Sequence, residues 1–215
     1  TAISFFLGIY AIRHLPFIDF RPYKIGNNIP EQMKLPPGAR RDSVVMTFIY
    51  RTGGKTVELT MHELSRVDST YEFVDRIDKV VRVGDRPKIT DYSVTDVNGK
   101  DATQETFEGV KLLIIIQNAA KASTANLSRI RDLIKGVEGY AEVMILTASP
   151  EAEFESFRHA HQLAAPFYFA DATVLKTIVR SNPGITLWVN GTVKGMWHHN
   201  DTPSADEIIE LIKKP

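Results

Sequence analysis

The sequence predicts an α/β fold for residues 87–215, with a mixed β-sheet and helices on both of its faces. From residue 111 onward, segments of strand and helix character follow one another in the order βαβαβαββα. Two short runs, Leu112–Ile116 and Val143–Leu146, are apolar throughout, which is typical of central strands buried on both faces. Alternation of strands and helices favours parallel βαβ units, and the final hairpin adds antiparallel strands.

The first segment, residues 1–15, is expected to be the end of a transmembrane helix. Its first twelve residues are uncharged and mostly apolar. As a helix they would rise about 18 Å, which is too short for a hydrocarbon core of about 30 Å. The segment would therefore be the exit half of a longer helix, with Arg13 and His14 at the level of the lipid headgroups. The alternative is an amphipathic or buried helix of a soluble protein.

Two further segments separate this stretch from the α/β domain. Residues 16–42 contain five prolines and are predicted to be an extended connector, because proline removes a hydrogen-bond donor and fixes φ. Residues 43–86 are predicted to form a small β-rich unit. Within it, a hairpin turns at Gly53–Gly54, and residues 71–83 form a further strand.

Local signals place the elements of the α/β domain. A strand and a tight turn are expected at 92–100, and helices are expected to begin near Ser123 or Thr124, Pro150, Asp171 and Ser204. Asn190–Gly191 indicates a type I′ turn between two strands, and Ser204–Glu207 is a capping box. The large aromatic side chains are predicted to lie in the core; they are Trp188, Trp197, Phe154, Phe157, Phe167 and Phe169.

Composition excludes several classes of function. The 215 residues include 26 basic and 26 acidic side chains, so the basic excess typical of nucleic-acid-binding proteins is absent. The chain contains no cysteine, and no disulfide, thiolate nucleophile or iron–sulfur cluster can form within it. The charge is not uniform: residues 1–60 carry eight basic and four acidic groups. The simpler explanation of this unevenness is a solvated surface with complementary faces. The alternative is that the basic stretch lies close to a membrane, although such a cluster is typical of the cytoplasmic side.

The order of elements resembles the thioredoxin fold, in the form found in thiol-disulfide reductases of the TlpA type and in peroxiredoxins. The resemblance covers roughly residues 87–215. It is carried by Tyr92–Lys100 with Phe107–Gly109, and by Asn182–Ile185, where the family keeps a cis-proline. Three longer strings are similar to bacterial DoxX/MauE-like membrane proteins with a C-terminal thioredoxin-like domain: Arg13–Gly26, Leu175–Gly184 and Trp197–Asp201. This second resemblance implies a membrane-anchored protein with its soluble part outside the cytoplasm, in the periplasm.

The chain departs from the thioredoxin family at the redox centre. The resemblance would place the two cysteines of a CxxC motif near Lys121 and Thr124, and neither residue is a thiol. Dithiol exchange by this chain alone is therefore excluded. The same region could still bind an anion or a peptide, with Lys121, Ser123 and Thr124 at a helix start. The alternative is that Ser123 or Thr124 only caps the helix.

Asn182, Pro183 and Gly184 complete the candidate binding site. The resemblance implies a cis bond at Pro183, and such a loop can present a backbone edge to an extended peptide. A weaker candidate, for a metal ion, is the cluster of His198, His199 and Asp201. Adjacent histidines on a strand point to opposite faces, so they chelate poorly unless the strand has ended. Asp201, with its neighbour, is more simply explained as part of a turn.

These observations favour a redox-silent, membrane-anchored binding module rather than an enzyme. Its partner would be a peptide, its own membrane domain or another envelope protein, and neither a cofactor nor a nucleic acid is expected. Two alternatives remain open. The domain could be an accessory to a thiol-disulfide oxidoreductase system whose cysteines lie in the membrane part or in a partner, or it could sense a small ligand.

Overall fold

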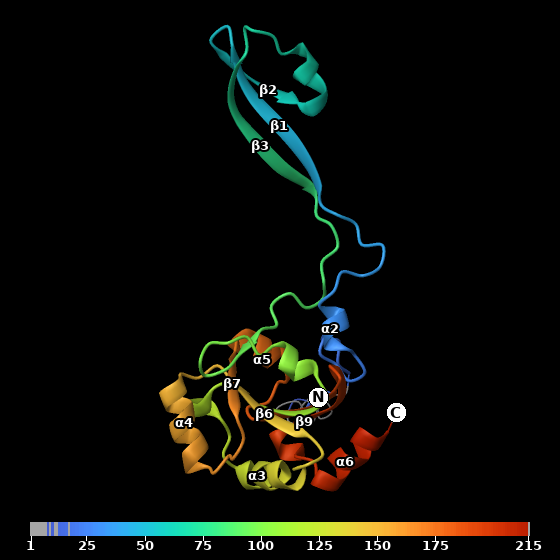
Figure 1. Cartoon of the computed structure of the whole chain (residues 1–215), viewed down its shortest axis with the longest axis vertical. Coiled ribbons are helices and arrows are strands. Elements are labelled where there is room, and N and C mark those ends of the chain that lie inside the picture. The colour runs from blue at the N-terminus through green and yellow to red at the C-terminus, as the bar shows by residue number, and fades with distance from the viewer. Residues whose placement is uncertain (1–7, 9, 11–12, 17, 215) are drawn as a thin grey trace. The chain divides into compact units, whose positions relative to one another are not determined.

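The computed structural model describes residues 8, 10, 13–16 and 18–214, and these residues form two compact units (Figure 1). One unit, here called the main unit, comprises Lys88–Pro215 together with Thr1–Lys34. The other, here called the inserted unit, is Leu35–Pro87. The predicted membrane segment, residues 1–15, lies largely outside the described residues. In the part that is described, no helix is both long enough and apolar enough to cross a bilayer.

The main unit is built on a six-stranded mixed sheet, as predicted. The strands, in the order in which they lie side by side, are β4 (Val94–Thr95), β7 (Phe167–Ala170), β6 (Glu142–Thr147), β5 (Val110–Ile116), β8 (Gly184–Val189) and β9 (Thr192–His198). Strand β6 pairs in parallel with both β5 and β7, whereas β8 is antiparallel to β5 and β9 is antiparallel to β8. A parallel half thus continues into an antiparallel hairpin within one sheet.

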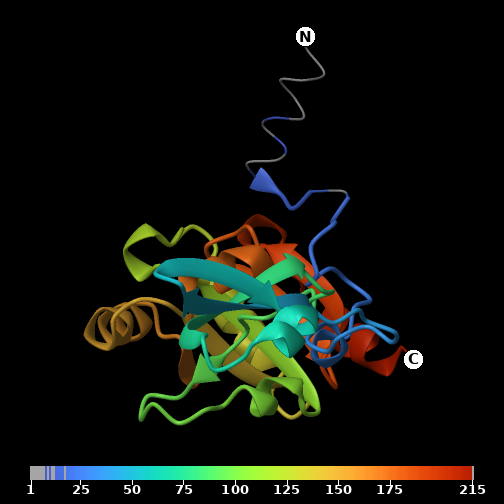
Figure 2. The ribbon, with the colours of Figure 1, turned by 90° about the horizontal axis from the view of Figure 1, so that it is seen from above.

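Helices cover both faces of this sheet, and β5 is buried between them (Figures 1 and 2). Leu113 and Ile115 of β5 pack on the face covered by α5 (Ala172–Ile178). Ile114 and its neighbours at 112 and 116 pack on the opposite face, against α3 (Leu127–Gly136), α4 (Glu151–Ala160) and α6 (Ala205–Lys213). This two-sided burial explains why the run Leu112–Ile116 is apolar throughout rather than alternating.

Most local signals of the main unit are confirmed. Asn190 and Gly191 both adopt positive φ, at 48° and 75°, as the tight turn between β8 and β9 requires. Ser204 and Glu207 form the predicted capping box at the start of α6. The carboxylate of Asp171 accepts hydrogen bonds from the first turn of α5. These signals act within four residues of chain, so the sequence carries them without tertiary information.

The prediction that residues 16–42 form an extended connector is wrong for their first half. Tyr23 and Ile29 are buried in the core of the main unit, and Ile29 begins the short helix α2 (Ile29–Gln32). The N–H of Gly26 donates to the carbonyl oxygen of Val193 in β9 at 2.8 Å, and Asn28 forms a β-bridge to Thr192. Because β9 is an edge strand, its free backbone groups need partners, and this segment supplies them.

The inserted unit is an antiparallel sheet of three strands in the order β2-β1-β3. Its strands are β1 (Ser43–Thr52), β2 (Lys55–Thr60) and β3 (Glu72–Arg82), and the 3₁₀ helix η1 (Met61–Arg66) follows β2. The predicted turn at Gly53–Gly54 is confirmed, because both glycines adopt positive φ. None of the described residues in these three strands is buried. The β-rich character was predictable, but the unit has no fully enclosed core.

Candidate functional site

The structure brings the two predicted halves of the binding site into direct contact. The N–H of Ser123 donates to the carbonyl oxygen of Asn182 at 2.9 Å. The side-chain amide of Asn182 in turn donates to the carbonyl oxygen of Asn118 at 2.8 Å. The Asn182–Pro183 peptide bond is cis, the isomer that the resemblance implies, and Gly184 begins β8 directly after it. We refer to residues 181–184 as the cis-proline loop.

The prediction that Ser123 or Thr124 caps the next helix is wrong. A 3₁₀ helix, η3 (Ala119–Lys121), follows β5, and the side chain of Asn118 caps it by accepting the N–H of Lys121 at 2.9 Å. The α-helix α3 begins only at Leu127. The side chains of Lys121, Ser123 and Thr124 therefore lie ahead of the helix rather than at its first turn. The helix dipole acts within about one turn of its end, so it does not support an anion site at these residues.

The backbone of the cis-proline loop is already hydrogen-bonded by the chain itself. Besides the bond from Ser123, the side-chain amide of Gln117 donates to the carbonyl oxygen of Ser181 at 3.3 Å, and the Ser181 hydroxyl donates to the carbonyl oxygen of Pro183. Each of these carbonyl groups thus already accepts one hydrogen bond from the chain. The side-chain oxygen Asn182 Oδ1 is buried and makes no hydrogen bond in the described structure.

A network of polar side chains joins the cis-proline loop to the end of β9. The N–H of His199 donates to the hydroxyl oxygen of Ser181 at 3.1 Å. The side-chain amide of Asn126 donates to Oδ1 of Asn200 at 3.0 Å and lies 3.1 Å from Nδ1 of His199. Sequence reasoning did not assign Ser181, Asn126 or Asn200 to the site. Asn126 precedes α3, but its side chain bonds the β9 end and makes no capping bond to its own helix.

The same turn after β9 holds the chain near its N-terminal end. Asn200 Nδ2 donates to the carbonyl oxygen of Arg13 at 2.9 Å. Nδ1 of His14 lies 2.7 Å and 2.9 Å from the two carboxylate oxygens of Asp201. The turn, which we call the 198–201 turn, therefore contacts the cis-proline loop on one side and Arg13–His14 on the other. Residues separated by 187 positions in the sequence meet at this point.

The histidine cluster has geometry that differs from the expectation for a continuous strand. Strand β9 ends at His198, and the two imidazole rings at 198 and 199 lie with their centroids 4.3 Å apart. Their Nδ1 atoms and the Asp201 carboxylate have intramolecular partners, however: His198 Nδ1 accepts the N–H of Asn200 at 3.1 Å. Among the described residues, no group of three or more histidine, aspartate or glutamate side chains is arranged to hold a metal ion.

The burial of His198 makes the stability of the main unit depend on pH. Burial is the largest cause that lowers the pKa of His198 to about 4; the neighbouring His199 and His14 act in the same direction, and Asp201 opposes them. The unfolded chain therefore binds a proton near pH 6.5, where the folded protein does not. The free energy of unfolding therefore does not depend on pH through His198 above pH 6.5, and it decreases as the pH falls from 6.5 toward 4. Because solvent screens part of this effect, we expect the free energy of unfolding to fall by about 1 kcal/mol between pH 7 and pH 5.

Urea unfolding at pH 7 and pH 5 measures this effect. His198→Asn is the matched variant, because its side-chain oxygen can accept the Asn200 N–H and does not titrate. We expect the variant to lose less stability than the native chain on acidification. An equal loss in both proteins would show that other groups cause the pH dependence.

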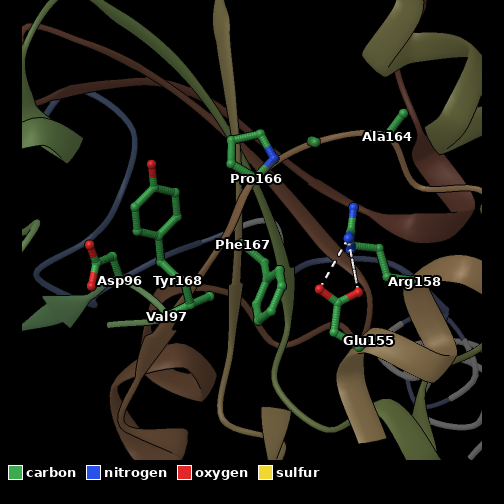
Figure 3. Close-up of a pocket in the computed structure, with 9 residues that line it drawn as sticks. Asp96, Val97, Glu155, Arg158, Ala164, Pro166, Phe167 and Tyr168 are labelled. Atoms are coloured by element: carbon green, nitrogen blue, oxygen red, sulfur yellow. Dashed lines mark hydrogen bonds and ion pairs between the residues drawn. The ribbon is translucent and has the colours of Figure 1, made fainter. Parts of the chain in front are cut away.

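A hollow beside β7 is lined by residues that were not predicted to form a site (Figure 3). It encloses about 520 Å³ and lies beside Phe167 and Tyr168 of β7. The Arg158 guanidinium at its rim is held by the Glu155 carboxylate, with contacts of 2.8 to 3.1 Å, as the dashed lines in Figure 3 show. Asp96 on the other side accepts backbone N–H groups of its own turn. The charged groups that line this hollow are thus paired or hydrogen-bonded within the chain.

Comparison with known proteins gives a family match only within the inserted unit. Residues 44–83 match the model of a Domain of unknown function (DUF8463), which corresponds to the three-stranded sheet. No curated protein sequence matches the chain. The match identifies the sheet as a recurring unit but assigns it no activity.

Among solved structures, the chain is similar to several thioredoxin-like proteins. StoA from Bacillus subtilis is 11% identical, with a TM-score of 0.42 over 57% of this chain and 96% of StoA. A secreted disulfide oxidoreductase of Mycobacterium tuberculosis is 12% identical, with a TM-score of 0.42 over 57% and 94% of the two chains. Thiol peroxidase from Chromobacterium violaceum is 16% identical, with a TM-score of 0.42 over 58% and 83%. The thioredoxin-like character of the main unit rests on its own strand order and directions.

Proposed function

We propose that the main unit is a redox-silent, thioredoxin-like docking domain, and that it docks the polypeptide segment leading into it. The observation that supports this proposal most directly is the double contact of the 198–201 turn, which holds both the cis-proline loop and Arg13–His14. In a thioredoxin-like reductase, this end of the fold would carry the thiol pair and receive a polypeptide. Here the thiols are absent, and the chain's own segment lies against the turn beside the loop.

The docked segment makes further specific contacts along its length. The Arg21 guanidinium donates to the carbonyl oxygens of Thr177 and Ile178 at 3.3 and 3.2 Å, and it pairs with the Asp19 carboxylate at 2.6 Å. These two carbonyls close α5, where the negative end of the helix dipole favours a cation. Leu15 packs against the core beside it. Together with the burial of Tyr23, these contacts indicate that the segment has one defined position on the main unit.

The docking also suggests why the domain would be held at a membrane. We propose that the apolar residues 1–12, immediately before Arg13, belong to a membrane-spanning helix and that the main unit lies on the periplasmic side. A domain that binds Arg13 and His14, the first residues after such a helix, would keep a fixed orientation relative to the membrane. Its partner would then be its own membrane domain, or another envelope protein reached from that position.

Limited proteolysis tests the docking. Trypsin cleaves after Arg13, and the contacts of Arg13 and His14 with the 198–201 turn should slow that cleavage. The His14–Asp201 pair is partly exposed, so its loss is worth less than about 1 kcal/mol, and we expect Asp201→Ala to accelerate cleavage at Arg13 about two- to fivefold. Mass spectrometry of the products at pH 7 identifies each site. Cleavage after Arg41, in the inserted unit, provides an internal reference that the substitution should leave unchanged.

Asp132→Ala serves as the matched control, because Asp132 is an exposed aspartate on α3 that does not contact the N-terminal segment. It should leave the rate of cleavage at Arg13 unaltered. Equal rates at Arg13 in the native chain and in Asp201→Ala would contradict the docking proposal. Faster cleavage at every site would indicate general destabilisation instead, and the reference at Arg41 distinguishes the two results.

A further inference from the structure

Strand β3 of the inserted unit is a long and fully exposed sheet edge. It is the outer strand in the order β2-β1-β3, and each of its eleven residues is exposed. Phe73, Ile77 and Val80 are among the exposed apolar side chains of the strand, with exposed fractions of 48 to 56%. Long sheet edges with unpaired backbone groups can pair with other strands, and natural proteins usually shorten, cover or charge them. An uncovered edge of this kind points to a partner strand.

The charges of β3 are complementary to those of a second, antiparallel copy of the strand. Its sequence is Glu-Phe-Val-Asp-Arg-Ile-Asp-Lys-Val-Val-Arg, with Ile77 at the centre. When two copies run antiparallel with Ile77 opposite Ile77, Arg76 faces Asp78 and Asp75 faces Lys79. Further out, Glu72 faces Arg82. Every charged residue of the strand then lies opposite the other sign, and apolar residues lie opposite apolar ones.

This register is the one that the central charges permit. In an antiparallel pair, the two residues opposite each other point to the same face of the sheet. Because side chains alternate between the two faces, residues paired between two copies of one strand must be an even number of positions apart. One residue, midway between them, therefore lies opposite its own copy. At positions 75, 76, 78 and 79 that residue would be an aspartate, arginine or lysine, and identical charges would repel across the axis. Ile77 is the uncharged residue among these five. The charge pattern therefore selects the axis at Ile77.

The backbone at the edge is also suited to this pairing. The two-residue turn at Gly53–Gly54 makes Thr52 and Lys55 a hydrogen-bonded pair, so Phe48 bonds to β2 by alternation. Its partner on β3, Arg76, therefore directs its N–H to the free edge. There it donates to the carboxylate of the adjacent Asp75 at 2.7 Å, a local bond that a partner strand would replace. Because orientation alternates along a strand, the N–H of Asp78 faces the same edge.

Irregularities in the pairing of β3 with β1 occur at Val74 and Val81, so residues 75–80 between them form a regular stretch. Arg76 of one copy and Asp78 of the other can then donate backbone N–H groups to each other's carbonyl oxygens. The two Ile77 residues face each other between these bonds, as a pair that is not hydrogen-bonded.

We propose that the inserted unit associates with a second copy of this chain through β3, antiparallel and about a twofold axis at Ile77. The two three-stranded sheets become one sheet of six strands, and the exposed edge is covered. The partner is thus identical, the interface is isologous, and the charges of β3 set its register. Association through backbone hydrogen bonds and a few side-chain pairs is expected to depend on protein concentration.

A single introduced cysteine tests the register directly, because the chain has none of its own. In the proposed dimer, the two Cα atoms at position 77 would lie about 4.5 Å apart, as in other pairs without hydrogen bonds. That separation lies within the range that a disulfide spans. We expect Ile77→Cys in the full chain to form a disulfide-linked dimer under mild oxidation. Glu58→Cys, an exposed position on the opposite edge strand β2, is the matched control and should form little disulfide-linked dimer.

Charge exchange tests the same interface without a covalent bond. Arg76→Asp places two aspartates opposite each other at two symmetric positions, and we expect it to weaken dimerisation about tenfold in sedimentation equilibrium. The double variant Arg76→Asp with Asp78→Arg restores opposite charges across the axis, and should return the dimerisation constant to near its native value. A chain that stays monomeric at every concentration would overturn the proposal. Crosslinking of Ile77→Cys no faster than the control, or no recovery in the double variant, would overturn it as well.

Discussion

Trp188→Ala is expected to lower the free energy of unfolding of the main unit by about 3–5 kcal/mol, the range for removal of a fully buried aromatic side chain. Trp188 is completely buried in β8, and its ring lies parallel to that of Phe107, with centroids 6.1 Å apart. Tyr92 packs against it at 5.7 Å. The indole N–H donates to the hydroxyl oxygen of Thr186 at 3.0 Å, so the substitution also removes a buried hydrogen bond.

Urea unfolding followed by circular dichroism measures the effect. Tyr140→Ala is the matched control, because Tyr140 is an aromatic residue of the same unit with 54% of its surface exposed. It should change the stability by no more than about 0.5 kcal/mol. A change of that small size for Trp188→Ala would show that the aromatic cluster does not carry the stability of this face of the sheet.

The sequence predicted the elements whose signals are local. Each of the central strands β5 and β6 contains an unbroken apolar run, and the turn at Asn190–Gly191 needs two residues with positive φ. Burial on both faces and turn geometry follow from neighbouring residues, so a single sequence suffices to find them. The assignment of Trp188 to the core is confirmed for the same reason, since a large apolar ring in a central strand has few other places to lie.

The sequence did not predict features that depend on contacts across the chain. Five prolines between residues 16 and 42 suggested an extended connector. Burial of the Tyr23 and Ile29 side chains removes apolar surface from water, and this favours packing of the segment on the main unit over an exposed linker. Similarly, Ser123 and Thr124 are good capping residues by type, yet Asn118 caps an intervening 3₁₀ turn and delays the helix to Leu127. Competing residues of similar propensity cannot be ranked without the tertiary structure.

The candidate site shows the same division between local and long-range information. The resemblance implied a cis bond at Pro183, which the structure has, and the carbonyl oxygen of Asn182 accepts the N–H of Ser123. That these residues bind a ligand stays a prediction. The contact from His14 to Asp201 joins residues 187 positions apart, and each has an ordinary polar side chain. Nothing in the surrounding residues marks such a pair. The contact between the N-terminal segment and the 198–201 turn therefore appears only when the chain is folded.

Gly184→Ala is expected to destabilise the main unit by about 1–3 kcal/mol, the usual cost of an added methyl group in a packed core. A Cβ at Gly184 would lie 2.2 Å and 2.8 Å from the two methyl carbons of Val179, which is fully buried at the end of α5. The φ of Gly184 is not positive, so steric overlap rather than backbone strain causes the loss. Glycine at this place in the cis-proline loop is thus explained by the close approach of α5 to β8.

A double-mutant cycle separates this overlap from other effects of the substitution. Val179→Ala removes both overlapping methyl groups and should itself cost about 1.5–3 kcal/mol through lost burial. In Gly184→Ala with Val179→Ala, the new methyl group occupies part of the space left by the valine, so we expect the double variant to be more stable than the sum of the single losses predicts, by at least about 1 kcal/mol. Urea unfolding of all four proteins gives the coupling energy. Strictly additive losses would mean that Val179 is not what excludes a side chain at position 184.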